Sequence, residues 1–361
     1  MDLSIRRHKQ AAAGVLLGVL LLFAGLIVPA QAQEPQIQDV KVTFHVQNVN
    51  RSKLPCGADG SEVTLSGRMV GPASVLANRD AHAPVTLYFH EFSFGKWFWH
   101  FPDPAYDYAA QMADQGHVSI LVDRLGYGDS THPNGFQTCL GADADEIHQI
   151  VTQVRAGTYQ TDSGTPRSYD HVVLAGHSGG AMASEISAYS FGGVDGLMVF
   201  AHANQQPSAH GIAEGLIQGA NCLFGGQPAG PGLPGGYAYF GQSDTDWQKD
   251  YFYGAEPRIV AAATPLRHRD PCGDVFSFAA GLLPNASNLH LIKVPVLLLY
   301  GLDDALYDQP AAGQTEKGLF GANPDVTLKY FPGSGHALNL QRTAPDVRAT
   351  VSTWLTARGL G

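Results

Sequence analysis

A buried apolar run, a glycine-rich turn and a helical stripe follow one another in the stretch VVLAGHSGGAMASEI, residues 172–186. The run Val172–Ala175 is typical of a strand that is buried on both faces of a parallel sheet. Apolar residues between Ala181 and Ile186 recur at helical spacing. The stretch therefore predicts a strand, a tight turn and a helix, with Ser178 on the turn.

The turn has the G-x-S-x-G pattern of a nucleophile elbow, in which a serine adopts a strained backbone conformation at the start of a helix. Small residues must stand two positions before and two positions after the serine, as Gly176 and Gly180 do, and His177 fills the variable position between them. The helix start behind the serine offers free backbone N–H groups to a developing oxyanion. This context makes Ser178 the candidate nucleophile.

Two further polar side chains follow the last two buried runs of the chain. The run Val294–Tyr300 is followed by GLDD, which ends at Asp304, and the run Val326–Phe331 leads to GSGH, which ends at His336. A serine nucleophile needs an imidazole base and a carboxylate that holds the imidazole in the right tautomer. We therefore predict that His336 is the base and that Asp304, in preference to Asp303, is the acid.

The rest of the chain continues the alternation of strands and helices. Alternating apolar residues at 40–46 and 63–69 predict antiparallel strands at a sheet edge. Continuous apolar runs separated by helical stripes predict an α/β fold with a mostly parallel, doubly wound sheet. The predicted buried strands are 85–89, 118–122, 172–175, 197–201, 294–300 and 326–331, and the predicted helices include 147–154, 181–189 and 347–355.

One interval, residues 204–291, interrupts this alternation. It contains a Gly/Pro-rich loop at 225–236 and many aromatic residues. We expect it to fold as a cap over the carboxyl ends of the strands, where ligands bind in such sheets. Its aromatics, among them Trp247, Tyr251 and Phe252, would supply an apolar wall. The expected organisation is a core of residues 33–203 and 292–361 with a cap of residues 204–291.

These residues resemble the motifs of the α/β-hydrolase fold family, from about Val85 to the C-terminus. The stretch DRLGYGDS at 123–130 looks like the D-x-x-G-x-G-x-S segment of this family, and GLDD looks like its acid loop, which supports Asp304. The resemblance implies a serine hydrolase that cleaves an ester, lactone or related acyl bond through a Ser-His-Asp triad and an acyl-enzyme, without a cofactor.

One position departs from the family pattern. Members usually carry His-Gly-x after the strand that corresponds to Val85–Phe89, whereas this chain has His90-Glu91-Phe92. By analogy, the backbone N–H groups of Phe92 and Gly179 would form the oxyanion hole. Glu91 either points outward, which we favour, or contacts the substrate.

Three alternatives remain open at this level. A lyase or a carbon–carbon bond hydrolase could use the same residues, and a hydrolase-fold protein could bind a ligand without catalysis. The aromatic run at 92–101 either lines an acyl pocket or packs in the core. The chain has 15 histidines but no H-E-x-x-H or other metal-ligand spacing, so no metal is expected.

The N-terminus reads as a targeting segment. A basic start and an apolar run, 11–30, precede the small-x-small sequence Ala30-Gln31-Ala32. This pattern predicts a signal peptide of residues 1–32 and an exported, secreted or periplasmic protein; an uncleaved membrane anchor is the alternative.

The four cysteines lie beyond that segment, at Cys56, Cys139, Cys222 and Cys272. An even number in an exported chain favours two disulfides over a zinc site, because no two cysteines stand close in sequence. Of the three connectivities we favour Cys56–Cys139 and Cys222–Cys272, because each pair then stays within one segment of the architecture.

The net charge of the chain limits the classes of molecule that it is expected to bind. With 22 basic and 32 acidic residues the net charge is −10, which disfavours nucleic acid. The expected partner is a small-molecule or oligomeric ester-type substrate, with membrane contact only if the N-terminal segment stays attached. The oligomeric state stays open.

Overall fold

The structure is a computed structural model that describes residues 36–78, 83–162 and 164–361. The predicted signal segment, residues 1–32, lies outside the described residues. Nothing in the described part forms a helix that is long and apolar enough to cross a membrane.

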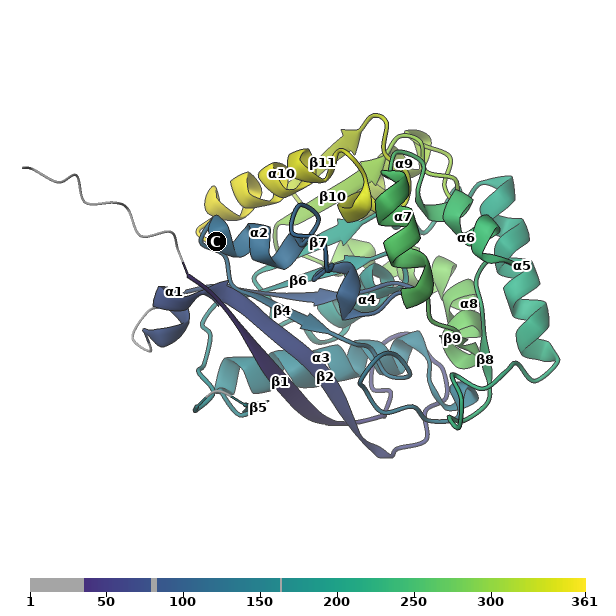
Figure 1. The fold of residues 1–361 in the computed structure, drawn as a ribbon, viewed down its shortest axis with the longest axis horizontal. Helices are drawn as coiled ribbons and strands as arrows, with labels where there is room; N and C mark the ends of the chain where they lie inside the picture. The colour runs from purple at the N-terminus through teal and green to yellow at the C-terminus, as the bar shows by residue number, and fades with distance from the viewer. Residues whose placement is uncertain (1–35, 79–82, 163) are drawn as a thin grey trace, which may run out of the picture. The chain divides into compact units, whose positions relative to one another are not determined.

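A nine-stranded sheet runs through the described chain in the order β11-β10-β7-β6-β3-β4-β2-β1-β5 (Figure 1). Its six central and C-terminal strands, β3, β4, β6, β7, β10 and β11, are mutually parallel. The strands β2, β1 and β5 extend one edge in antiparallel pairing. The strands of this sheet are β1 (Ile37–Gln47), β2 (Glu62–Pro72), β3 (Val85–Phe89), β4 (Ser119–Val122), β5 (Gln160–Thr161), β6 (Val172–His177), β7 (Gly196–Phe200), β10 (Val296–Gly301) and β11 (Val326–Phe331).

The sheet confirms the predicted α/β class and the extra antiparallel strands near the N-terminus. Strands β3, β6, β7 and β10 are buried along their whole length, because helices cover both faces of a parallel sheet. Strand β1 alternates between buried and exposed residues, as the pattern at 40–46 predicted.

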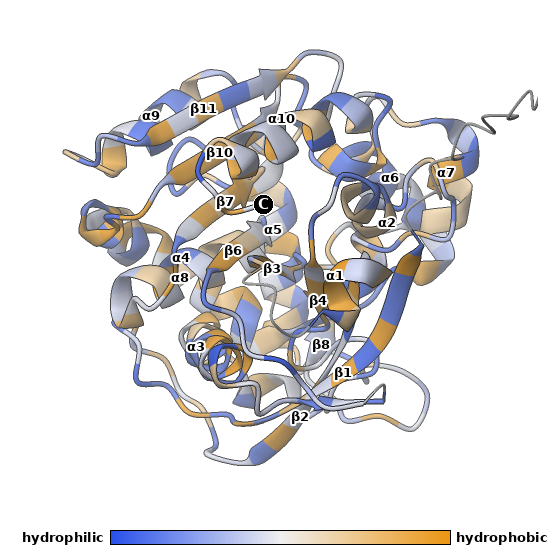
Figure 2. Cartoon of the chain, turned by 90° about the vertical axis from the view of Figure 1, so that its left-hand side faces the viewer, coloured by the Kyte–Doolittle hydropathy of each residue, from blue (hydrophilic) through white to orange (hydrophobic). Residues whose placement is uncertain are grey.

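Helices cover both faces of the sheet. Figure 2 shows α3, α4 and α9 on one side and α2 and α10 on the other, with largely apolar strands between them. Helix α3 ends where Gly157 adopts a left-handed conformation. The helices are α1 (Ala73–Ala77), α2 (Tyr108–Asp114), α3 (Leu140–Ala156), α4 (Gly179–Phe191), α5 (Ala209–Leu223), α6 (Asp244–Tyr251), α7 (Pro257–Ala263), α8 (Cys272–Asn288), α9 (Ala311–Leu319) and α10 (Ala344–Thr356), with short 3-10 helices at Lys96–Phe98, Gly135–Gln137, Thr264–Leu266, Leu289–Leu291 and Leu338–Leu340.

The interval between β7 and β10 contains helices α5 to α8 and a small two-stranded sheet. That sheet pairs β8 (Tyr237–Ala238) with β9 (Asp270–Pro271). Both disulfides form in the expected pairing: Cys222–Cys272 joins the end of α5 to the start of α8, and Cys56–Cys139 joins the loop after β1 to the start of α3.

Candidate active site

Ser178 occupies the turn between β6 and α4, as the sequence predicted. Its backbone has φ 47° and ψ −111°, a conformation that L-residues rarely adopt. A Cβ added to Gly176 would lie 2.3 Å from the carbonyl oxygen of Gly180, and one added to Gly180 would lie 2.4 Å from that of His90. The two glycines therefore allow the turn to close against its neighbours, and the serine is presented at the carboxyl edge of the sheet.

His336 and Asp304 meet at the same edge, after β11 and β10. Nδ1 of His336 lies 2.7 Å from Oδ2 of Asp304, and both side chains are fully buried. The other oxygen of Asp304 accepts a hydrogen bond from the backbone N–H of Leu306 at 2.8 Å. Asp304 thus holds the imidazole with Nδ1 protonated and Nε2 facing the site.

Asp303, the alternative acid, has a different place. Its carboxylate accepts a hydrogen bond from the backbone N–H of Gly333 at 2.8 Å, and its own N–H donates to Ser334. Asp303 therefore ties the acid loop to the histidine loop, whereas Asp304 contacts the imidazole.

The preference for an outward-pointing Glu91 was wrong. Its side chain is 1% exposed, and its Oε2 lies 3.0 Å from Nε2 of His336. His90 fixes the loop after β3. Its Nδ1 donates to the carbonyl of Glu91, and its Nε2 accepts from the backbone N–H of Arg124. A carboxylate is stable in this interior only beside a group that can donate a proton, and His336 is that group.

His336 consequently has a carboxylate on each ring nitrogen. Burial alone would lower the pKa of its imidazole, but the charges of Asp304 and Glu91 outweigh burial and raise the pKa to about 10. Within the described chain no hydrogen bond joins Ser178 to His336. Glu91 occupies the nitrogen that would accept the serine proton.

His177, the variable residue of the elbow, lies beneath this pair. Its Nδ1 is 3.8 Å from Oε2 of Glu91, and its Nε2 donates to the backbone carbonyl of His336 at 2.9 Å. The ring stacks on Phe98 at a centroid distance of 4.6 Å. Burial lowers the pKa of His177 to about 4, so the ring is neutral at neutral pH.

Phe92 and Gly179, the expected oxyanion donors, lie side by side. Gly179 begins α4, where backbone N–H groups lack helical acceptors. A Cβ on Gly179 would stand 3.5 Å from the ring of Phe92, so the loop after β3 lies against the helix start. The two expected donors therefore belong to neighbouring segments of the chain.

The aromatic run at 92–101 divides between two roles. Phe92 lines the cavity beside Ser178 and packs against Phe278 of α8. Phe94 instead packs in the interior against Trp247 and Tyr251. Most of the run is therefore core, and Phe92 is its contribution to the cavity.

A cavity of about 280 Å³ opens over Ser178. Its walls are mainly apolar and come largely from α5 and α8. A larger groove, about 670 Å³, lies beside the Cys56–Cys139 disulfide and touches none of the catalytic candidates. The cavity over Ser178 is lined by residues that include Glu91, Phe92, Ile212, Leu216, Gln218, Phe240, Tyr251, Val275, Phe278, Leu282, Leu306 and Tyr307.

The predicted apolar wall is thus only partly correct. Tyr251 lines the cavity, but Trp247 is fully buried and packs behind it against Phe94 and Phe252. Trp247 and Phe252 support the wall and do not form it.

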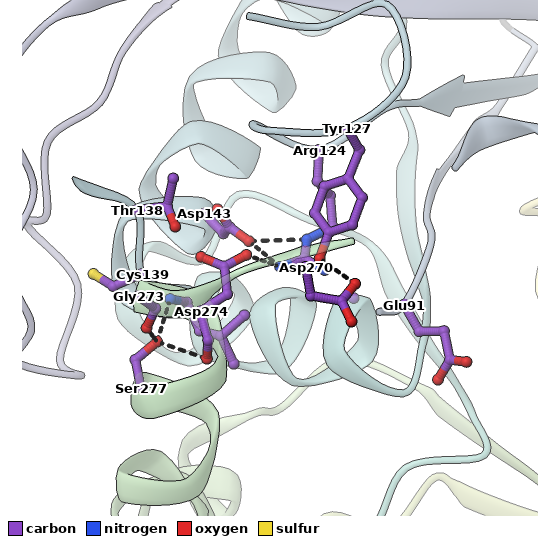
Figure 3. Close-up of polar contacts among 12 residues, drawn as sticks. Glu91, Arg124, Tyr127, Thr138, Cys139, Asp143, Asp270, Gly273, Asp274 and Ser277 are labelled. Carbon is purple, nitrogen blue, oxygen red and sulfur yellow. Dashed lines mark hydrogen bonds and ion pairs between the residues drawn. The ribbon is translucent and has the colours of Figure 1, made fainter. Parts of the chain in front are cut away.

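A buried polar cluster ties the interval 204–291 to the core (Figure 3). Arg124 pairs with Asp143 of α3 at 2.5 Å and with Asp274 of α8 at 2.6 Å. Asp270 accepts hydrogen bonds from the backbone N–H of Ser93, at 2.5 Å, and from Tyr127. These contacts fix the loop after β3 against β9 and the loop after β4 against α8, which forms one wall of the cavity.

Comparisons with known proteins agree with this architecture. The model of the alpha/beta hydrolase family matches residues 86–349. No curated protein sequence matches the chain.

Several solved structures share the fold at low sequence identity. A thermophilic esterase from Thermogutta terrifontis is 16% identical, covers 87% of this chain and 99% of its own, and has a TM-score of 0.60. A monoacylglycerol lipase from Paleococcus ferrophilus is 17% identical over 76% of this chain and 96% of its own, with a TM-score of 0.56. A bacterial membrane phospholipase A is 16% identical over 88% and 87%, with a TM-score of 0.56. With its family model matched over most of its length and this sheet in place, the chain belongs to the alpha/beta hydrolase family.

Proposed function

We propose that the protein is a serine hydrolase that cleaves an ester, lactone or related acyl bond. The observation that carries the proposal is the convergence, at one edge of the sheet, of Ser178 on its strained turn with the His336–Asp304 pair. The cavity, whose walls are mainly apolar, leads to Ser178. The esterase and lipases with the same fold support the reaction class.

In the proposed mechanism Ser178 attacks the carbonyl carbon and forms an acyl-enzyme. His336 accepts the serine proton at Nε2, passes it to the leaving group and then activates water for deacylation. Asp304 keeps Nδ1 protonated and stabilises the imidazolium. The N–H groups of Phe92 and Gly179 bind the oxyanion. Because Glu91 holds Nε2 in the structure, this contact must open before the serine proton can be transferred.

Residues 204–291 would act as a cap that selects an apolar acyl group. Helix α5 buries the polar residues Glu214 and Gln218 and exposes the apolar residues Ile212 and Leu216 at the mouth of the cavity. An apolar rim that continues into an apolar cavity favours a substrate with a hydrocarbon or aromatic acyl group over a charged one.

We also propose that the protein is exported. The two disulfides support this, because disulfides persist in oxidising compartments. Expression of the full chain with and without residues 1–32, followed by fractionation and N-terminal sequencing, tests both export and cleavage after Ala32.

Labelling with a fluorophosphonate tests the nucleophile directly. The reagent should modify Ser178, identified by peptide mass spectrometry, and Ser178→Ala should lose labelling while it keeps its melting temperature. Turnover of p-nitrophenyl esters should fall by ~10⁴ to 10⁶, as in triad knockouts. If the alanine variant retains a tenth of wild-type turnover, Ser178 is not the nucleophile. Product analysis on lactones separates hydrolysis from lyase chemistry.

A further inference from the structure

Three buried side chains direct ligand atoms at one point beside the proposed nucleophile. Oε2 of Glu91, Nδ1 of His177 and Nε2 of His336 all lie within 4.8 Å of one another. The carboxylate oxygen is 3.0 Å from the His336 nitrogen and 3.8 Å from the His177 nitrogen. Tetrahedral zinc with bonds of about 2.0–2.2 Å spaces its ligand atoms about 3.3–3.6 Å apart, so small side-chain adjustments bring all three into its shell.

The outer nitrogen of each ring is already engaged by an oxygen acceptor. Nδ1 of His336 bonds to Asp304 at 2.7 Å, and Nε2 of His177 bonds to the carbonyl of His336 at 2.9 Å. Because a carboxylate and a carbonyl can only accept, these nitrogens carry the ring protons in the neutral tautomers. The lone pairs then lie on the two nitrogens that face Glu91. Oxygen partners of this kind orient metal-bound histidines in known sites.

Two of the inward atoms have no hydrogen-bond partner in the described chain, although they are buried. These are Nδ1 of His177 and Oε1 of Glu91. Buried polar atoms nearly always have a hydrogen-bond partner, so each of these two atoms needs an explanation. A bound metal ion would satisfy both, one as a direct ligand and the other as part of a ligating carboxylate.

The charges of the site also favour a dication. Glu91 and Asp304 bring two carboxylates into the interior, and the protonated imidazole of His336 between them balances only one of the two charges. No lysine or arginine of the described residues forms an ion pair with either carboxylate. In Figure 3 the carboxylate of Glu91 points away from the cluster around Arg124. A divalent ion bound to Glu91 with two neutral imidazoles would balance both negative charges.

We propose that Glu91, His177 and His336 form a binding site for a divalent transition-metal ion, with Zn²⁺ as its natural occupant. Two imidazoles and one carboxylate suit zinc and cobalt better than calcium or magnesium, which prefer oxygen ligands. Because Ser178 and Glu91 line the same cavity, the site would take its fourth ligand, a water molecule, from that side.

Such an ion has a direct consequence for the proposed reaction, and this consequence rests on the proposed function. A metal on Nε2 of His336 removes the lone pair that would accept the serine proton. Zinc therefore inhibits acylation of Ser178, and removal of the zinc by a chelator restores acylation. Binding itself does not depend on the enzyme being a hydrolase.

The test uses the mature protein after treatment with a chelator. Co²⁺ is titrated and followed by its visible absorption, and Zn²⁺ is titrated by calorimetry. We expect one ion per chain and a tetrahedral cobalt spectrum. Glu91→Gln and His177→Gln should each weaken binding at least tenfold. His210→Gln is the matched control, because His210 pairs with Asp250 outside the site and reports adventitious binding by surface histidines.

Melting temperatures show whether each variant folds. If Glu91→Gln or His177→Gln fails to fold, Asp304→Asn serves in its place, since loss of such a supporting carboxylate typically costs 10–100-fold in affinity. Absence of stoichiometric binding, or binding that survives the folded Glu91→Gln or His177→Gln variant, overturns the site.

The two proposals fail separately. Cobalt binding at these residues, together with no fluorophosphonate labelling of Ser178 in the chelator-treated protein, supports the metal site and refutes the serine hydrolase. Labelling and turnover without metal binding refute the metal site and leave the hydrolase standing. When both hold, Zn²⁺ should slow labelling of Ser178, and chelator should reverse the effect.

Discussion

The carboxylate of Glu91 lies 3.0 Å from Nε2 of His336, on the side of the imidazole opposite Asp304. The base of the proposed triad is therefore held by two carboxylates. Its neighbours set how the site responds to pH, to substitution and to metal ions.

Removal of the Glu91 charge should move the pH profile of activity to lower pH. The pKa of His336 is raised to about 10 chiefly by Asp304 and Glu91 against the effect of burial, with His177 also facing the ring and Tyr251 and Tyr307 packed on it. The proposed base works only when neutral, so wild-type kcat/KM should rise as the pH approaches 10. In Glu91→Gln the rise should come at lower pH, because the imidazole loses one of the two carboxylates that raise its pKa. Each tenfold loss of proton affinity makes the neutral form about tenfold more abundant at neutral pH.

The measurement is kcat/KM for one ester between pH 6 and 10.5 in buffer with chelator, which keeps metal ions out of the comparison. An unchanged profile in a folded Glu91→Gln variant would show that Glu91 does not act on His336. Asp129→Asn, a carboxylate outside the site that pairs with Lys96, controls for general charge effects.

The two neighbouring aspartates should differ strongly in their effect on turnover. Asp304→Asn replaces the acceptor at 2.7 Å from Nδ1 of His336 and favours the wrong tautomer, so kcat should fall by ~10⁴ as in a comparable triad substitution. Asp303→Asn changes only the bond to Gly333 and should cost much less. Steady-state kinetics on both variants decide the matter, and the reverse order would assign the acid to Asp303.

Substitutions in the cavity and behind it should separate specificity from stability. Leu216 and Phe278 line the cavity, so alanine at either position should favour bulky esters over short ones. Trp247 is fully buried behind the wall, so Trp247→Ala should lower the melting temperature, with a cost of about 3–5 kcal/mol, and reduce activity on all esters together. The comparison is kcat/KM for acetate and benzoate esters with melting temperatures alongside. Equal losses on both esters in the Leu216 and Phe278 variants would rule out a role in specificity.

Stability should depend on pH through His100. Hydrogen bonds to Asp107 and Asp39 raise the pKa of His100 to about 9, despite partial burial. A group whose pKa is raised in the folded state stabilises the folded protein fully at pH values below its pKa in the unfolded chain, about 6.5. This stabilisation is lost as the pH rises past the folded-state pKa of about 9. His100→Gln should therefore melt below wild type at pH 6 and close to it at pH 10.

Thermal melts at both pH values test this. His171→Gln is the control, because that histidine is half-exposed and its 3.6 Å contact with Asp195 is longer than a hydrogen bond. An equal loss at pH 6 and pH 10 would mean that His100 contributes packing and not charge.

Local sequence determined most of the fold. Continuous apolar runs placed the buried strands within a few residues of their observed bounds, because only a sheet covered on both faces tolerates them. The elbow could be predicted from its glycines, because a side chain at Gly176 or Gly180 would clash with the neighbouring backbone. Ser178, Asp304 and His336 could be placed because each stands on the loop that follows a strand, and parallel strands end at one edge.

Tertiary structure decided the surroundings of the imidazole. Glu91 and His336 are 245 residues apart, and His177 is 159 residues from His336, so no spacing in the sequence reveals their approach. The glutamate in place of glycine was the one local signal, and it could not tell outward from inward. Burial decided that question, because a carboxylate inside the protein must lie beside a partner that compensates its charge. The cavity wall was likewise a matter of packing: Trp247 and Tyr251 stand four residues apart on α6, yet only Tyr251 reaches the cavity.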